Sequence, residues 1–344
     1  MVDAMWGETV GGPPELSVVV PMYNEEHSLH LLFDRLRPVL DGLGADYETL
    51  VVDDGSTDLT PALLEKARRG WPQLRIIRLR VNAGHQAAIS AGLLRARGDY
   101  VVTIDADCQD PPETIPEMLA TARERQVDVV YGVRSDRSSD TVFKRVSAHL
   151  FYSAFRKASS STAASHAGDF RLMSRATVNV VNSLPEHSRV LRFVVPALGF
   201  PSAEVAYVRE ARSAGTSKYS LARMVALSVD SFTTFSTAPL RVATGLGIVG
   251  ALFAVVFAVF VVANRLLGNP VAGWASTVLV VVIASAVQLL CLGVLGEYIA
   301  RMYAQMQGRP THFVAYDSLA DPIGDGSVDV AAPRQASVGE QRRR

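Results

Sequence analysis

The sequence predicts an α/β domain, with a mostly parallel sheet covered by helices, followed by a two-helix transmembrane hairpin. Two observations lead to this fold class. Up to residue 240, short apolar runs rich in β-forming residues alternate with helical patterns, which is the order that builds a parallel sheet with helices on its faces. Beyond residue 240, two uncharged runs have the length of membrane spans.

The first part of the chain contains four predicted strands. These are Leu16–Met22, Tyr47–Asp53, Leu74–Leu79 and Tyr100–Asp105, and the helical patterns between them include Glu25–Leu43 and Gln86–Arg97. Polar clusters follow the first, second and fourth strands, at residues 23–26, 54–58 and 106–110. Because ligands of parallel sheets bind beyond the carboxyl ends of the strands, we expect these three loops to converge on one ligand-binding edge.

Two further segments have amphipathic helical patterns. Val142–Lys157 carries an apolar stripe with Lys and Arg on its other faces, which fits either a helix packed on the sheet or a helix lying on a membrane surface. Both interpretations stay open. The segment 218–239 has a similar stripe and leads directly into the first uncharged run, so we expect it to lie on the bilayer as an interfacial helix.

The two uncharged runs are predicted to form the hairpin. Val242–Ala263 has 22 residues without a formal charge, and as a helix it would be roughly 33 Å long, enough to span a bilayer core. Val271–Gly296 has a similar reach, and only residues 264–270 separate the two. A buried helix pair in a soluble protein is the weaker alternative, because such runs exceed what ordinary core helices need.

The charges flanking the spans predict the topology. Arg241 precedes the first span, and Arg301 and Arg309 follow the second, so the positive-inside rule places both flanks in the cytoplasm and the turn outside. Met1–Glu15 lacks the apolar stretch of a signal peptide, so we expect the first 240 residues to stay in the cytoplasm. The predicted protein is thus a two-span protein of the inner or plasma membrane with both termini cytoplasmic. The expected regions are a flexible N-terminus (1–15), a cytoplasmic domain (16–217), a juxtamembrane helix (218–239), the hairpin (240–301) and a largely disordered tail (302–344).

Composition excludes several partners. The 34 Lys and Arg residues balance 34 Asp and Glu residues, whereas binding a nucleic-acid backbone needs a surplus of positive charge, so no nucleic acid is expected. The two cysteines, Cys108 and Cys291, form no disulfide framework and fit a reducing compartment.

The strongest local signal for chemistry is the segment IDADCQDPPE at residues 104–113. Asp105 and Asp107 stand one residue apart at the end of a predicted strand, and carboxylate oxygens are ligands that suit Mg²⁺ or Mn²⁺ bridging a diphosphate. Acidic turns are common, so this pair alone would be weak. Its place at the predicted ligand edge makes a metal site the better interpretation.

Two neighbouring loops offer further ligands. The segment 53–56, Asp-Asp-Gly-Ser, could bind a nucleobase or ribose, and it could equally cap the helix that follows. The segment 82–86 opens the next helix, whose backbone N–H groups could face a phosphate. His85, within it, is by itself as consistent with a surface residue as with a ligand contact.

One motif must be rejected. Residues 245–250, GLGIVG, match a dinucleotide fingerprint, but no strand precedes them and they lie inside an apolar span. Their small residues instead favour close helix packing. We therefore expect a homo-oligomer held partly through the spans, with a tetramer as one option.

Seven motifs, taken together and in this order, resemble family 2 glycosyltransferases. They are VPMYNEE (20–26), VDDGSTD (52–58), NAGHQAA (82–88), DADCQDPPE (105–113), YGVRSDR (131–137), GDFRLMSR (168–175) and SAGTSKY (213–219). Over residues 16–310 the chain looks most like polyprenyl-phosphate glycosyltransferases, specifically the bactoprenol glucosyltransferase type with two membrane spans, which is related to dolichyl-phosphate mannose synthase. The resemblance implies a GT-A fold for the cytoplasmic domain.

The resemblance also implies roles for individual residues. The nucleotide-sugar would contact Pro21, Tyr23, Glu25, Asp54, Asp105 and Ala106; the metal would be held by Asp105, Asp107 and Gln109; phosphate groups would be gathered by Arg134, Arg137, Arg171, Arg212, Ser217 and Lys218; and Asp105, Asp107, Asp169 and Arg171 would act in catalysis. The residue types agree with these roles, since guanidinium groups match phosphate oxygens.

The expected activity is transfer of a hexose, with inversion, from a nucleotide-sugar to a polyprenyl monophosphate. UDP-glucose is favoured as the donor over GDP-mannose. A phosphate monoester is largely a dianion at neutral pH and needs little help from a base, so we expect Asp169 to orient groups, although relatives with hydroxyl acceptors can use that position as a base. The alternatives are a processive polysaccharide synthase, whose Q-x-x-R-W motif is missing, and a non-catalytic membrane scaffold.

Overall fold

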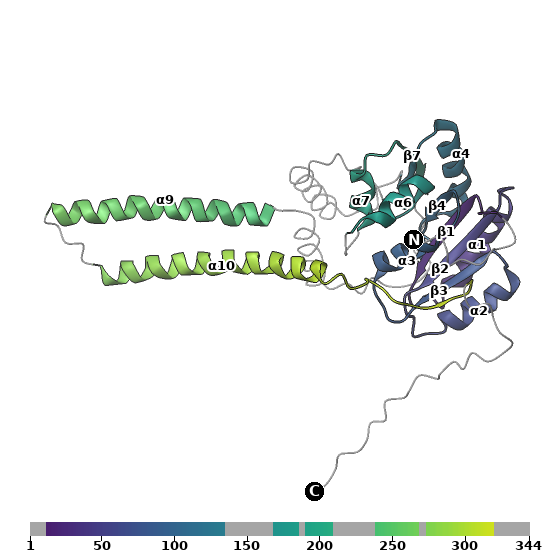
Figure 1. Ribbon diagram of the computed structural model, residues 1–344, viewed down its shortest axis with the longest axis horizontal. Coiled ribbons are helices and arrows are strands. Elements are labelled where there is room, and N and C mark those ends of the chain that lie inside the picture. Colours follow the sequence, from purple (N-terminus) through teal and green to yellow (C-terminus); the bar gives the residue numbers. More distant parts are fainter. Residues whose placement is uncertain (1–11, 135–167, 186–189, 209–237, 268–272, 320–344) are drawn as a thin grey trace, which may run out of the picture.

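The computed structural model describes residues 12–134, 168–185, 190–208, 238–267 and 273–319. It consists of a globular part built around one sheet and two long helices that project from it (Figure 1). The predicted α/β domain with an apolar C-terminal helix pair is therefore confirmed. The segment 142–157, most of the predicted juxtamembrane helix, and residues 1–11 and 320–344 lie outside the described residues.

The sheet has eight strands in the order β7-β5-β6-β4-β1-β2-β3-β8. Their bounds are β1 Leu16–Met22, β2 Tyr47–Asp53, β3 Leu74–Leu79, β4 Tyr100–Thr103, β5 Val129–Arg134, β6 Arg171–Ser174, β7 Ser202–Tyr207 and β8 Val314–Asp317. The strands β4, β1, β2 and β3 are parallel to one another, as predicted. However, β6 runs antiparallel to β4 and β5, and β8 runs antiparallel to β3, so the sheet as a whole is mixed, as in GT-A folds.

Helices cover both faces of the sheet. Their bounds are α1 Leu29–Asp41, α2 Thr60–Gly70, α3 His85–Arg95, the 3₁₀ turn η1 Pro112–Thr114, α4 Ile115–Arg125, α6 Arg175–Ser183 and α7 Leu191–Ala197. One core layer joins the sheet to α1, α2 and α4, and the other joins it to α3, α6 and α7.

The central strand β1 shows why these residues form a buried parallel strand. All seven of its residues are buried, as expected for a strand covered on both faces. Val18 and Val20 face the layer containing α1, whereas Val19 faces α3. At Gly92 in α3, an added Cβ would lie 2.3 Å from a methyl group of Val19, so this glycine is needed for the close approach of α3 to β1.

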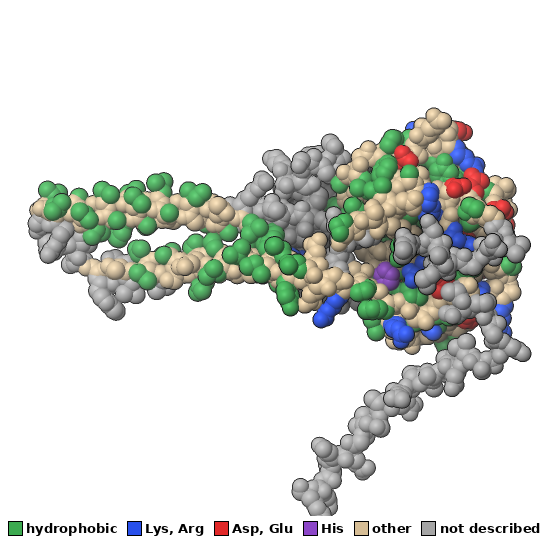
Figure 2. All heavy atoms as spheres, in the orientation of Figure 1, with side chains coloured by type: hydrophobic (Ala, Val, Ile, Leu, Met, Phe, Trp, Pro, Cys, Tyr) green, Lys and Arg blue, Asp and Glu red, His purple; other side chains and the backbone are tan. Residues whose placement is uncertain are grey.

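The two long helices are α9, Ala238–Leu266, and α10, Trp274–Met306. They lie side by side, and the Cys291 thiol contacts the carbonyl oxygen of Ala243 at 3.7 Å. Both contain stretches apolar and long enough to cross a membrane, with hydrophobic side chains exposed along their length (Figure 2). Transferring such surface to water is unfavourable, whereas lipid tails cover it without cost. The predicted helix pair is confirmed, and α10 continues ten residues beyond the predicted Gly296.

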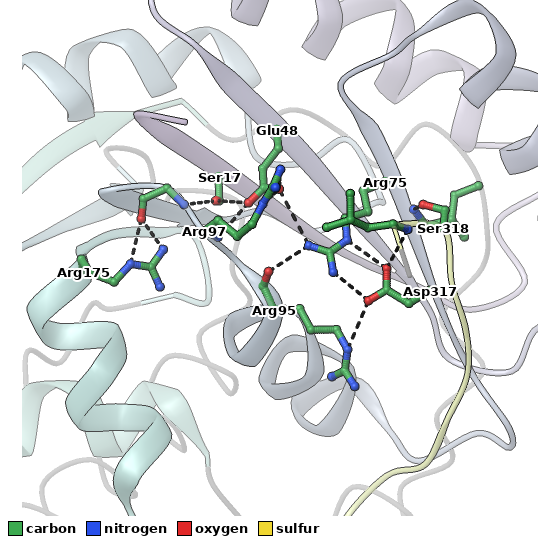
Figure 3. Close-up of polar contacts among 11 residues, drawn as sticks. Ser17, Glu48, Arg75, Arg95, Arg97, Arg175, Asp317 and Ser318 are labelled. Carbon is green, nitrogen blue, oxygen red and sulfur yellow. Dashed lines mark hydrogen bonds and ion pairs between the residues drawn. The ribbon is translucent and has the colours of Figure 1, made fainter. Parts of the chain in front are cut away.

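The chain after α10 departs from the prediction of a disordered tail. Strand β8 pairs with β3 at the edge of the sheet, and Arg75 donates to both carboxylate oxygens of Asp317 at 3.0 and 2.7 Å (Figure 3). Ser318 adds two hydrogen bonds to the backbone of Ile76. We call residues 313–318 the C-terminal strap. The prediction was wrong here because the strap's stability comes from partners about 240 residues earlier, which its own composition cannot reveal.

Candidate functional site

Hydrogen bonds join the loops that follow β1, β2 and β3 at the carboxyl edge of the sheet. The Asn24 side chain, after β1, accepts from the backbone N–H of Thr57, after β2, at 2.9 Å. The Asp54 carboxylate, also after β2, accepts from the N–H groups of Ala83 and Gly84, after β3, at 2.7 and 2.9 Å. The loop after β3 thus joins the three loops that the sequence indicated.

Asp54 has a structural task in addition to its predicted nucleotide contact. Its side chain is buried, and this burial raises the pKa of its carboxyl while the two backbone donors lower it. These two hydrogen bonds to Asp54 hold the turn before α3 in place. Gly55 has a φ of +70°, and a Cβ there would lie 2.8 Å from the backbone of Val81 and Asn82, so glycine is required for this close approach.

The other predicted nucleotide contacts differ in exposure. Pro21 is buried within β1, and Ala106 is buried after β4. Glu25 is half-buried, its N–H donates to the Thr60 hydroxyl at 2.9 Å, and its carboxylate accepts from Ser28. Tyr23 is exposed at the edge and is therefore the side chain of this set most open to a ligand. Contact with a nucleotide stays a prediction for all of them.

A cluster of carboxylates surrounds the end of β4. The Nε2 atom of His85 lies 3.4 Å from Oδ1 of Asp105 and 3.7 Å from Oδ2 of Asp169, so His85 stands between two loops that are 64 residues apart in sequence. Partial burial lowers the pKa of His85, but the two carboxylates outweigh it and raise the pKa overall. Sequence reasoning left His85 undecided, because neither partner is near it in the chain.

The charge balance of this cluster favours a bound cation. Loss of water around Asp105 raises its pKa to about 6; His85 opposes this shift, and the carboxylates of Asp169, Asp110 and Asp107 add to it. Carboxylates crowded in this way are stabilised by a divalent metal. Asp107 and Asp105 fit Mg²⁺ or Mn²⁺, which bind one or two carboxylates together with substrate phosphates.

Gln109, the third predicted metal ligand, forms a hydrogen bond with Asp107, the second. Its amide Nε2 donates to the Asp107 carboxylate, which leaves its Oε1 as the atom that could bind a metal. Within the described ranges, no three or more His, Cys, Asp and Glu side chains are grouped so that they could hold a metal ion by themselves. A metal bound by Asp105 and Asp107 would therefore take its remaining ligands from water and substrate.

Arg171 corrects one expectation. Its side chain is fully buried, and its Nη atoms donate to Asp169 at 3.0 Å and to the carbonyl oxygens of Gly168 and Leu191 at 2.8 and 2.7 Å. It therefore does not gather substrate phosphates, as the resemblance had implied, because a side chain enclosed by protein cannot reach them. Arg171 is thus the buried ionic partner of Asp169. His85, 3.7 Å away, and the positive charges of Arg171 and Arg192 hold the pKa of Asp169 well below its usual range despite burial.

Of the other predicted phosphate ligands, only Arg134 lies within the described residues. It is exposed at the end of β5, and its Nε donates to the Tyr207 hydroxyl at 3.4 Å. Tyr207 in turn donates to Asp110, and its burial raises the pKa of its hydroxyl. The remaining set, Arg137, Arg212, Ser217 and Lys218, lies outside the described residues, and its phosphate-binding role stays a prediction.

Sequence reasoning missed Arg192, in α7. Its Nη2 atom lies 3.3 Å from Oδ2 of Asp169, so it belongs to the same cluster. Its partner Asp169 lies 23 residues earlier in the chain, and only the folded chain brings the two together.

Comparison with known proteins identifies the family. Residues 17–180 match the family model described as glycosyl transferase family 2. An uncharacterized glycosyltransferase of Bacillus subtilis (strain 168), YkcC, is 39% identical over 302 residues, which cover 87% of this chain and 93% of that relative. The bactoprenol glucosyl transferase of Shigella phage SfV is 35% identical over 301 residues, covering 87% of this chain and 98% of that relative.

A solved structure with a similar fold is that of glucosyl-3-phosphoglycerate synthase from Mycobacterium tuberculosis in complex with Mn²⁺, UDP-glucose and phosphoglyceric acid. It has 23% sequence identity and a TM-score of 0.47, and the match covers 64% of this chain and 78% of that one. The two sequence relatives are matched over nearly their whole length, so the resemblance seen in the seven motifs is confirmed. The chain belongs to glycosyl transferase family 2, in the group that includes the bactoprenol glucosyl transferases.

Proposed function

We propose that this glycosyltransferase moves a hexose from a nucleotide-sugar to a polyprenyl monophosphate, with inversion at the anomeric carbon. UDP-glucose is the first candidate donor and GDP-mannose the second. The proposal depends on one observation above all: the carboxylate cluster lies at the sheet edge that the chain reaches after two helices of membrane-spanning length. The names of relatives such as the SfV bactoprenol glucosyl transferase support a polyprenyl acceptor.

The connection between the site and the apolar helices is short. The N–H of Arg80, directly after β3, donates to the carbonyl oxygen of Phe313 at 2.9 Å. Residues 307–313 join this point to the end of α10, and even a fully extended segment of that length spans only roughly 25 Å. The carboxyl edge of the sheet therefore stays near the end of the apolar helix pair. The phosphate of a membrane-bound lipid would lie at the membrane surface, close to this edge of the sheet. In this proposal both chain termini are on the cytoplasmic side.

The residues of the site divide the work of the reaction. The acceptor phosphate is largely a dianion, so positioning two anionic substrates matters more than removing a proton. Asp169, held by Arg171, acts as an orienting residue. Asp105, Asp107 and Gln109 would hold Mg²⁺ or Mn²⁺, which when bound supplies positive charge for the departing diphosphate.

The remaining predicted residues bind the two substrates. Tyr23, with Pro21, Glu25, Asp54 and Ala106, forms the nucleoside side of the site. Arg134, together with the predicted set Arg137, Arg212, Ser217 and Lys218, gathers phosphate oxygens through charge-assisted hydrogen bonds. Direct attack of a phosphate oxygen on the anomeric carbon opposite the leaving diphosphate gives the inverted product.

A transfer assay tests the proposal. The purified full chain would be incubated with Mg²⁺ or Mn²⁺, undecaprenyl phosphate in detergent, and radiolabelled UDP-glucose or GDP-mannose in parallel. We expect label in the chloroform-extractable fraction, dependent on the lipid phosphate, from one of the two donors. Label in an insoluble polymer would support a processive synthase instead. Absence of any transfer, from a preparation that melts cooperatively, would support a non-catalytic scaffold.

A further inference from the structure

Two side chains fix the start of α7: Gln86, which is half-buried, and Arg171, which is fully buried. The backbone N–H of Leu191 donates to the Gln86 side chain of α3 at 3.0 Å, and the carbonyl oxygen of Leu191 accepts from Arg171 of β6 at 2.7 Å. The Leu191 side chain itself is buried. Because both backbone groups and the side chain of Leu191 are held, the backbone position of the next residue, Arg192, is set by the core of the domain.

From this position the Arg192 side chain reaches the carboxylate cluster. Its Nη2 atom lies 3.3 Å from Oδ2 of Asp169, the oxygen that also lies 3.7 Å from Nε2 of His85. His85 is in turn 3.4 Å from Asp105. Arg192 is therefore separated from the first predicted metal ligand by only two side chains.

The two arginines beside Asp169 differ in what they can still bind. Arg171 is fully buried, and both of its Nη atoms donate to protein oxygens. The side chain of Arg192 is 41% exposed, Asp169 is the one ionic partner recorded for it among the described residues, and its Nε has no hydrogen-bond partner there. A guanidinium has five N–H donors; the Nε–H of Arg192 is buried and one Nη2 donor faces Asp169, so its remaining Nη donors are the ones available to a ligand.

A purely structural role explains this arrangement less well. Arg171 already provides Asp169 with a buried cation at 3.0 Å, so a second arginine is not needed to compensate that carboxylate. An arginine that only covered the surface would gain little from being placed by two side-chain hydrogen bonds to its neighbour's backbone. An exposed guanidinium held rigidly beside carboxylates is suited to an anion that arrives together with a cation.

We propose that Arg192 contacts a phosphate oxygen of a substrate and is a binding residue of the transfer reaction. This inference rests on the proposed function, because it takes the anion to be either the diphosphate of the nucleotide-sugar or the monophosphate of the lipid acceptor. The shared chemistry is a phosphate oxygen that accepts hydrogen bonds from a guanidinium fork, and no covalent bond to Arg192 is formed or broken.

The test compares Arg192→Gln, Arg192→Lys and wild-type full chain. The KM for labelled UDP-glucose or GDP-mannose and the KM for undecaprenyl phosphate are measured separately, and UDP and GDP binding is titrated without the lipid. We expect Arg192→Gln to raise one KM by about 10- to 100-fold, the loss expected for one charge-assisted hydrogen bond. A change in the nucleotide-sugar KM and in nucleoside diphosphate affinity assigns the donor, and a change in the lipid KM alone assigns the acceptor. Arg192→Lys recovers part of the loss, because it keeps the charge without the fork.

Arg97→Gln is the matched control. Arg97 is also partly exposed, at 38%, and also pairs with a buried carboxylate, Glu48, but it lies at the opposite edge of the sheet. We expect this variant to leave both KM values unchanged.

Two results would overturn the inference. One is an Arg192→Gln protein with wild-type KM values and wild-type nucleoside diphosphate affinity. The other is a fall in kcat alone, as expected for a residue that merely orients Asp169. If the wild-type chain transfers no sugar to the lipid, the proposed function fails, but binding titrations still decide the role of Arg192. Weakened binding of UDP or GDP, or of undecaprenyl phosphate titrated in detergent, in Arg192→Gln supports it, and equal binding of all three overturns it.

Discussion

The two edges of the parallel strands carry charged clusters of opposite character. At the amino ends, Glu48 and Asp317 are shared among three arginines, Arg75, Arg95 and Arg97 (Figure 3). At the carboxyl ends, four aspartates, Asp105, Asp107, Asp110 and Asp169, lie near two arginines and His85. In the first cluster both carboxylates are paired with arginines of the protein, whereas the second has an excess of negative charge that a bound cation would balance.

The amino-edge cluster is built for stability. Asp317 is buried, and the hydrogen bonds and charge of Arg75 hold its pKa below the usual range despite that burial. Glu48 accepts from the Ser17 hydroxyl and from the N–H of Arg97, both at 2.7 Å. These contacts join β1, β2, β3 and the C-terminal strap. Arginines and carboxylates occur at both edges. At the amino edge the carboxylates are paired and stabilise the fold, whereas at the carboxyl edge the unpaired negative charge can bind a ligand.

The largest effect is expected from breaking the pair at the amino edge. Asp317→Ala leaves Arg75 buried without its carboxylate, and such losses cost about 3–5 kcal/mol. We expect a lower midpoint of thermal unfolding, with UDP or GDP affinity retained by the folded protein. The double variant Arg75→Met with Asp317→Leu is the control, since removing both charges together is far less costly. A midpoint for Asp317→Ala equal to that of the wild type would show that the strap does not stabilise the sheet.

A comparable change at the carboxyl edge is expected to act on activity instead. Asp105→Asn should lower the transfer rate by about 100-fold or more, the scale seen when a charge-stabilising group is removed from an active site. Its unfolding midpoint should stay the same or rise, because one of four crowded carboxylates becomes neutral. Asp34→Asn, on the exposed face of α1, should change neither quantity. An Asp105→Asn protein with an unchanged rate would remove this residue from the reaction.

Adding a metal should stabilise the protein through the carboxyl-edge cluster and not through the amino-edge cluster. Mg²⁺ or Mn²⁺ at 100 times its dissociation constant should stabilise the wild-type protein by about 2.7 kcal/mol, and a chelator should reverse this and stop transfer. The double variant Asp105→Asn with Asp107→Asn should show no such gain, whereas Asp317→Ala should show it in full. An equal thermal shift in the double variant would place the metal elsewhere.

The smallest effect is expected at the rim of the amino-edge cluster. Arg97 is 38% exposed, and exposed ion pairs contribute little because water screens them. Arg97→Gln should therefore lower the stability by less than about 1 kcal/mol and leave transfer unchanged. A loss as large as that of Asp317→Ala, measured by the same thermal scan, would mean that the network acts as one cooperative unit.

The sequence predicts the elements whose signals are local. The bounds of β1, β2 and β3 agree with the prediction, because each is an apolar run bounded by polar turns. Asp105 and Asp107 lie at the predicted edge for the same reason: an apolar strand ends directly before them. The apolar helices were predictable from length and lack of charge alone.

The sequence could not reveal features that depend on distant partners. Strand β8 is only four residues long and gains its place from Arg75. Arg171 is held by two acceptors in its own segment, Gly168 and Asp169, and by Leu191, 20 residues later, so its motif alone could not distinguish a phosphate ligand from a structural arginine. His85 and Arg192 likewise could not be assigned to the site from the sequence, because only the fold brings both of them close to Asp169.

One paired measurement tests most directly whether the amino edge of the sheet serves stability and the carboxyl edge serves activity. Label transfer to undecaprenyl phosphate and the unfolding midpoint would be recorded side by side for the wild type, Asp105→Asn and Asp317→Ala. The account predicts that the wild type transfers label and that Asp105→Asn loses transfer but keeps the wild-type unfolding midpoint. It predicts that Asp317→Ala has a lower unfolding midpoint but still binds UDP or GDP when folded. A wild type that transfers no sugar, or an Asp105→Asn protein that transfers at the wild-type rate, would contradict it.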